Sequence, residues 1–167
     1  MIKAALLYKD ELQKKFLEHW YEPETKYYSG TCCGIPDLVD TNQDKRQYVS
    51  IGKDGSVIGY IAHNINWCTR SAQNWGMISF DKGNLTFIRD LRTVVTNLLV
   101  KENFNRVEWW CFADNPAVRG YCNFVKRFGG KEVGHMHNSA MFSDGSLHDT
   151  LIFEILKEDV YDKLNNT

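Results

Sequence analysis

The sequence has no long apolar run, no marked excess of either charge and no CxxC pair, and each absence excludes a class of protein. No stretch approaches the ~18 consecutive apolar residues of a membrane-spanning helix. The 20 Lys and Arg are balanced by 21 Asp and Glu, so the chain lacks the net positive charge of a general DNA or RNA binder. Without a CxxC pair, a structural zinc site is not expected. We therefore expect neither a membrane nor a nucleic acid as partner.

The cysteines and the amino terminus predict a protein of the reducing cytoplasm. The five cysteines are odd in number and scattered, and a disulfide between the adjacent Cys32 and Cys33 would be strained. The apolar run near the start, Ala4 to Tyr8, has only five residues, and a signal peptide needs more.

The remaining composition is that of one globular domain. A chain of 167 residues is long enough to bury roughly 70% of its unfolded surface in a single core. Aromatic residues make up 13% of the sequence, which excludes a disordered chain. No repeat or low-complexity tract is present, and the prolines at 23, 36 and 116 lie between patterned segments.

Apolar periodicity and turn residues predict the order of the elements. Two helices have clear caps: Asp10 begins a helix that runs to about Tyr21, and Asn84 begins a longer one over 85–99. A third helix starts at Asn115–Pro116 and ends at Gly129–Gly130. The segment 22–45 is irregular, with at most one short helix, and strands are expected at 4–8, 48–52, 57–66, 74–80, 106–112, 131–142 and 147–156.

This order predicts an α/β protein with a mixed sheet of six to seven strands and helices on both faces. The helix between strands 74–80 and 106–112 makes a crossover, so these two strands should be parallel. Short polar turns, such as 53–56 and 143–146, predict antiparallel hairpins elsewhere.

Two segments carry a resemblance to a known family: residues 113–121 (ADNPAVRGY) and 128–134 (FGGKEVG). With the element order around them, they resemble the GNAT superfamily of N-acetyltransferases, as a divergent member. The similarity covers about 47–156, the core of a single domain over 1–167, and residues 1–46 match the variable acceptor-side region of the family.

The resemblance implies an acetyl-CoA site between strands 74–80 and 106–112. The family holds the pyrophosphate on backbone amides of a glycine-rich loop at a helix N-terminus. Here that loop has one glycine and an aspartate, Asp81, which favours weaker binding. The resemblance assigns the pantetheine to the main chain of Ile78, Ser79 and Phe80 and to Asn115, the pyrophosphate to Lys82, Gly83, Asn84, Leu85 and Thr86, and the 3′-phosphate to Arg119, with Lys126 and Arg127 beside it.

Each of these cofactor assignments has a structural alternative. Asn115 is also suited to cap the helix that it begins. Arg119, Lys126 and Arg127 are equally typical of a solvated basic helix face.

The catalytic groups are assigned by the same resemblance. A base must remove a proton from the attacking amine, and an acid can protonate the leaving thiolate. Tyr121 is the candidate acid, although the family's tyrosine position falls near Cys122 or Val125, depending on where the count starts. Glu108 and His63 are the candidate bases; alternatively Glu108 pairs with Arg106, and His63 is a buried strand histidine.

Three other groups of residues could carry chemistry. His135 and His137 share one strand face and could bind a metal, but no Cys or carboxylate completes a set at recognisable spacing, so no metal is expected. A nucleophilic site of Cys111 and His135 has no supporting motif. The aromatic side chains of Trp20, Tyr21, Tyr27 and Tyr28 line a substrate pocket or belong to the core.

The sequence therefore predicts an enzyme that transfers an acetyl group from acetyl-CoA to a primary amine, by direct attack in a ternary complex. The acceptor is a small molecule or a peptide, and the sequence leaves room for a homodimer. The alternative is a GNAT-fold module that has lost catalysis, which the reduced glycine loop and the shifted tyrosine favour.

Overall fold

The computed structural model describes residues 1–29, 36–38 and 44–165. The predictions that concern Gly30, Cys32, Cys33 and Gly34 lie outside this part of the chain. Among the described residues, no helix combines the length and the apolarity needed to cross a membrane.

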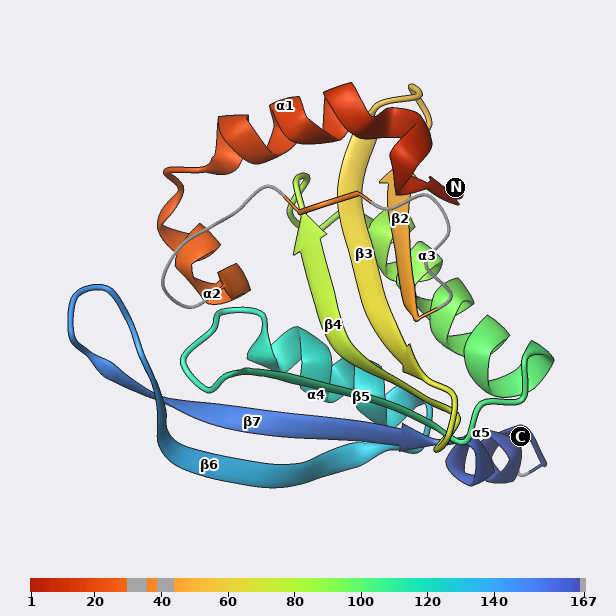
Figure 1. Cartoon of the computed structure of the whole chain (residues 1–167). Helices are drawn as coiled ribbons and strands as arrows, with labels where there is room; N and C mark the ends of the chain where they lie inside the picture. Colours follow the sequence, from red (N-terminus) through yellow and green to blue (C-terminus); the bar gives the residue numbers. More distant parts are fainter. Residues whose placement is uncertain (30–35, 39–43, 166–167) are drawn as a thin grey trace.

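A seven-stranded mixed sheet forms the centre of the molecule (Figure 1). Its strand order is β1-β2-β3-β4-β5-β7-β6, and only β4 and β5 are parallel neighbours. The strands span Ile2–Ala4 (β1), Lys45–Ile51 (β2), Val57–Asn66 (β3), Ser71–Ser79 (β4), Arg106–Phe112 (β5), Lys131–Met141 (β6) and Leu147–Leu156 (β7). This arrangement confirms the predicted fold class and the parallel crossover.

Helices cover both faces of the sheet, as predicted. One core cluster joins α3 (Leu85–Thr96), α4 (Val118–Arg127) and α5 (Lys157–Asn165) to the strands, and α3 continues as a π-helical turn, η3 (Asn97–Lys101). The other cluster lies under α1 (Lys9–His19), where Leu12 and Phe16 are buried. The short helices η1 (Ala5–Tyr8), η2 (Pro23–Thr25) and α2 (Lys26–Ser29) complete this second face.

Four details of the sequence prediction were wrong. The segment 4–8 is a 3-10 turn after the short β1, because Ala and Leu favour helical backbone and Ala5 packs into the core. Asp10 lies inside the first turn of α1, with Tyr8 at the cap position. Strand β4 begins at Ser71 rather than at 74, and helix α5 was not predicted.

A glycine in β3 sets how closely α3 approaches the sheet. A Cβ on Gly59 would lie 2.3 Å from a ring carbon of Phe87, in the first turn of α3. The bare backbone at Gly59 therefore lets Phe87 pack against β3, and this contact fixes the start of α3.

We predict that Gly59→Ala destabilises the fold by about 1–3 kcal/mol, because the new methyl group must displace a buried ring. Urea denaturation followed by circular dichroism measures the change. Gly120→Ala is the matched control: its Cβ meets nothing within 4 Å in α4, so the same substitution should leave stability unchanged or raise it slightly. Equal stability of Gly59→Ala and the wild type would contradict the packing argument.

Candidate active site

The parallel strands β4 and β5 pair only at their beginnings. Their register joins Ser71 to Arg106 and Ala72 to Val107, and among the described residues no further pair follows. Figure 1 shows β4 and β5 diverging beyond this point. The main chain of β4 beyond Ala72 therefore has β3 on one edge and no strand on the other.

A β-bulge in β4 causes this divergence. Ala62 of β3 pairs with Gly76 and Asn64 pairs with Gln73, so one residue of β3, His63, opposes the two residues Asn74 and Trp75. Asn74 has a positive φ of 54°, a left-handed conformation that Asn tolerates better than most residues. The bulge follows directly after the last pair between β4 and β5 and bends β4 away from its neighbour.

The side chain of Trp75 stabilises the bulge. Its indole N–H donates to the carbonyl of Ala72, the last β4 residue that pairs with β5, over 3.2 Å. Its ring stacks on His63 with centroids 4.6 Å apart. Trp75 therefore stands at the point where the two strands separate.

A cavity of about 500 Å³ occupies the space between the diverging strands. Its walls come from both faces of the sheet, so it connects the α3–α4 side with the α1–α2 side. The lining residues include Trp75 to Ser79 of β4, Trp110 and Cys111 of β5, Lys82 to Asn84 before α3, Asn115 to Ala117, Gly120 and Tyr121 at α4, and His19, Glu22, Glu24, Tyr27 and Tyr28.

The main chain of β4 offers hydrogen-bonding groups to this cavity. The amide of Phe80 donates to Ile58 of β3 over 2.9 Å, and Ser79 lies opposite Gly59. Because backbone direction alternates along a strand, the groups of Met77 and Ser79 point away from β3, toward the open edge. Of the three residues expected along the pantetheine, only Ser79 directs its main-chain groups toward the cavity. Met77 does so as well, although the sequence analysis did not name it.

The loop between β4 and α3 has the predicted cap. The Asn84 side-chain oxygen accepts from the amide of Thr86 over 2.8 Å, and Gly83 has a φ of +81°. Asp81 is held inside the loop, since Asn84 Nδ2 donates to Asp81 Oδ2 over 2.6 Å and the Asn84 amide donates to the Asp81 carbonyl. Two of the amides expected to bind pyrophosphate are thus already used. Within residues 1–29, 36–38 and 44–165, the amides of Gly83 and Leu85 have no such partner.

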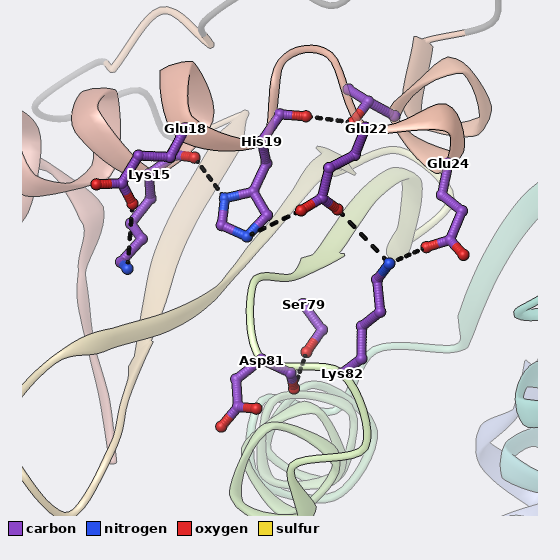
Figure 2. Close-up of polar contacts among 9 residues, drawn as sticks. Lys15, Glu18, His19, Glu22, Glu24, Ser79, Asp81 and Lys82 are labelled. Carbon is purple, nitrogen blue, oxygen red and sulfur yellow. Dashed lines mark hydrogen bonds and ion pairs between the residues drawn. The ribbon is translucent and has the colours of Figure 1, made fainter.

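Lys82 forms ion pairs with the acceptor-side segment (Figure 2). Its Nζ lies against a carboxylate oxygen of Glu24 and 3.5 Å from Glu22 Oε2. The hydrogen bond to Glu24 raises the pKa of the Lys82 ammonium. The predicted phosphate-binding lysine is therefore already neutralised by two carboxylates that come from the other side of the cavity.

His19 is a candidate base that the sequence analysis missed. Its Nδ1 lies 2.8 Å from the carbonyl of Lys15, and because a carbonyl only accepts, Nδ1 must carry the proton (Figure 2). In the neutral ring, Nε2 then has the free lone pair, and it lies 3.7 Å from Glu22 Oε1. Helical spacing places His19 on the same face as the buried Leu12 and Phe16, and this pattern could have indicated it.

Tyr121 lines the cavity from α4, against Trp109 and Phe153. Burial raises the pKa of its phenol, so the hydroxyl keeps its proton at neutral pH. Burial also raises the pKa of the nearby Cys111 thiol to about 12, so this cysteine is not a thiolate nucleophile. Asn115 lines the cavity and forms a turn just before α4, with its side-chain oxygen accepting from the Ala117 amide over 2.8 Å. The helix begins at Val118 with Ala117 at the cap position, so the predicted start at Asn115–Pro116 was wrong.

The other expected residues do not reach the cavity wall. Glu108 pairs with Arg106 over 2.8 Å, and Arg119 is exposed on α4. His63 lies buried behind Trp75. The cavity is lined by seven of the expected residues, Ile78, Ser79, Lys82, Gly83, Asn84, Asn115 and Tyr121, and not by Phe80, Leu85, Thr86, Glu108, His63 or Arg119.

Solved structures share the fold of this chain. Spermidine N-acetyltransferase from Vibrio cholerae in complex with CoA and spermine is similar with a TM-score of 0.73 and 15% identity, over 96% of this chain and 97% of that one. A variant of the enzyme from the same organism gives 0.70 and 16%, over 96% and 95%. A probable acetyltransferase gives 0.58 and 20%, over 70% and 64%. No protein-family model and no curated protein matches the sequence.

The chain has the GNAT acetyltransferase fold. The architectural part of the sequence resemblance is confirmed, including the parallel pair β4 and β5. At identities of 15–20%, these comparisons establish the fold alone.

The burial of His63 gives a pH-dependent stability that can be measured. Burial, with a smaller effect of Arg46, lowers the pKa of His63 from 6.5 to about 3, and among the described residues neither ring nitrogen has a hydrogen-bond partner. Below about pH 6.5, the unfolded chain therefore binds a proton at His63 that the folded chain does not bind. The stability from His63 is fully present above pH 6.5 and is lost as the pH falls from 6.5 toward 3.

We predict that His63→Phe reduces the difference in unfolding free energy between pH 7.5 and pH 5.5 by about 1.4 kcal/mol. The lower pH is one unit below the ordinary histidine pKa, and one unit corresponds to about this energy. Urea denaturation of both proteins at the two pH values measures it. Tyr48→Phe is the control and should keep the wild-type difference, because it alters a ring in contact with His63 but removes no group that titrates between these pH values. An identical pH dependence in His63→Phe would show that His63 is not held neutral by the fold.

Proposed function

We propose that this protein transfers the acetyl group of acetyl-CoA to the primary amine of a small cationic acceptor. The observation that carries the proposal is the cavity between β4 and β5, open to both faces of the sheet, with the capped start of α3 at one end. Such a passage accommodates a thioester from one side and an amine from the other, as direct attack in a ternary complex requires.

The donor would lie along the open edge of β4. The main-chain groups of Met77 and Ser79 are available to an extended pantetheine in the manner of an added strand. Asn115 stands on the opposite wall, and the amides of Gly83 and Leu85 lie where the helix dipole favours a phosphate. Among the structurally similar enzymes, one is in complex with CoA.

The acceptor side has the character of a site for a cation. Glu22 and Glu24 lie beside the aromatic rings of Tyr27, Tyr28 and Trp110 in the cavity wall. Carboxylates and ring faces both attract an ammonium group. One similar structure contains spermine, which makes spermidine and spermine suitable first acceptors to test.

The chemistry needs a base and an acid on opposite sides of the thioester. We assign the base to His19 Nε2, because His19 lies in the cavity wall, whereas neither Glu108 nor His63 lines the cavity. Nε2 lies 3.7 Å from Glu22 Oε1, so the amine would approach between the two groups. The amine nitrogen attacks the carbonyl carbon and gives up its proton to the base, and the C–S bond breaks. Tyr121 donates its phenolic proton to the departing sulfur.

One observation favours the second candidate, a GNAT-fold module without catalysis. Lys82 is paired with Glu22 and Glu24, and two loop amides are satisfied within the loop, so pyrophosphate must displace contacts that already exist. Binding of acetyl-CoA separates the two candidates.

We predict that acetyl-CoA binds saturably and changes the fluorescence of Trp75 and Trp110, which line the cavity. Gly83→Val should abolish this binding, because a β-branched residue resists a φ of +81° and the amides of the loop would move. Gly55→Val is a matched control, since Gly55 also has open space and a positive φ of 88° but lies in a hairpin turn away from the cavity. Absence of any saturable change up to millimolar acetyl-CoA would leave only the non-catalytic candidate.

We predict that Tyr121→Phe lowers kcat for spermidine acetylation by about 10²-fold while the affinity for acetyl-CoA stays unchanged, because only the proton donor is lost. Thiol release measures turnover, and the fluorescence titration measures binding. Tyr161→Phe makes the same chemical change on α5, outside the cavity, and should retain full activity. Full activity of Tyr121→Phe would remove Tyr121 from the reaction.

A further inference from the structure

The β6–β7 hairpin brings together three metal-ligating side chains outside the acetyl-transfer cavity. His135 Nε2 lies 2.8 Å and His137 Nδ1 lies 2.9 Å from the same carboxylate oxygen, Oδ2 of Asp149. All three ligand atoms lie within 4.8 Å of one another. The sequence analysis found the two imidazoles but expected no carboxylate to complete the set, and Asp149 provides it from the neighbouring strand.

An irregularity of the hairpin produces this arrangement. Met136 pairs with Thr150, and the next pair is Ala140 with His148, so three residues of β6 oppose the single residue Asp149. Asn138, in the middle of the three, has a φ of 49°. Its amide donates to Asp149 Oδ1 over 2.8 Å. That bond holds the carboxylate so that Oδ2 faces both imidazoles.

Both imidazoles pair with one carboxylate oxygen, and this arrangement leaves three metal-ligating groups open to solvent. The imidazoles of His135 and His137 are 43% and 76% exposed, so an ion can reach them without any opening of the fold. The amide of Asn138 and the two imidazoles lower the pKa of Asp149 to about 2, so the carboxylate is ionised at neutral pH. The amide of Asn138 holds the second carboxylate oxygen of Asp149. Hydrogen bonds of this kind are typical of carboxylates that bind metal ions, because they orient the ligand.

We propose that His135 Nε2, His137 Nδ1 and Asp149 Oδ2 bind a divalent transition-metal ion of the zinc class. Ligand bonds of ~2.0–2.1 Å in a tetrahedron place ligand atoms about 3.3 Å apart. The two N–O separations of 2.8 and 2.9 Å therefore need to widen by only a few tenths of an ångström. Imidazole nitrogen favours zinc, nickel and copper over magnesium and calcium, and three protein ligands leave the remaining position to water.

The test uses the full chain without a histidine tag, because a tag would itself bind the metal. Zn²⁺ is titrated in competition with a chromophoric chelator, and cobalt is added separately to record its visible spectrum. We expect one Zn²⁺ per chain, a cobalt spectrum of low coordination number, and no competition from Mg²⁺. These outcomes would support the site.

The variants decide whether these three residues are the ligands. His137→Ala and Asp149→Asn should each weaken Zn²⁺ binding at least tenfold, and circular dichroism checks that both remain folded. His137 is the most exposed of the three side chains, so its removal leaves the core intact. His148→Ala is the matched control on the same hairpin: His148 pairs with Asp114, so its loss should leave Zn²⁺ affinity unchanged.

Two results would overturn the proposal. One is the absence of saturable Zn²⁺ binding by the wild-type chain. The other is Zn²⁺ binding that His137→Ala and Asp149→Asn retain in full, which would place the ion elsewhere. Neither result bears on acetyl transfer, because none of the three residues lines the cavity between β4 and β5.

Discussion

The separation of β4 from β5 is the constraint on which the rest of the site depends. Two parallel strands that stayed paired would fill the passage with their own hydrogen bonds, and neither a thioester nor an amine could enter it. The separation follows from the bulge at Asn74 and Trp75, directly after the last pair at Ala72 and Val107. The open edge of β4 and the two-sided cavity both follow from this bend.

The charges around the cavity connect its two ends. Lys82 belongs to the loop that would hold phosphate, but its carboxylate partners Glu22 and Glu24 belong to the side that would hold the amine. A bound phosphate would compete with these carboxylates for the ammonium group of Lys82. A carboxylate that lost its contact with Lys82 would then be free to attract a cation. In the proposed enzyme, Lys82 would therefore connect the donor side of the cavity to the acceptor side.

Short sequence patterns predicted the features that depend on contacts between nearby residues. The remaining features of the site depend on pairing between strands that are distant in the sequence. The Asn84 cap and the helix after it involve residues a few positions apart, and the sequence analysis predicted both. It gave the pairing of Glu108 with Arg106 as the alternative to a catalytic role. Which edge of β4 is open depends on a bulge opposite His63, which strand alternation does not reveal. For the same reason the analysis named His63 but not Trp75 or Met77, and it could not bring Asp149 to His135 and His137.

Two of the irregular strand positions have the same feature, an asparagine in the left-handed conformation. Asn74 lies in the β4 bulge and Asn138 in the β6 bulge. Glycine adopts such backbone angles more easily, but it loses more conformational entropy on folding and offers no side chain. Asparagine tolerates them through local hydrogen bonds and costs less than other residues with a Cβ. The bulge at Asn74 lies where β4 and β5 separate. The bulge at Asn138 brings together the three side chains of the proposed metal site on the surface. The same kind of backbone irregularity therefore separates strands in one place and assembles side chains in another.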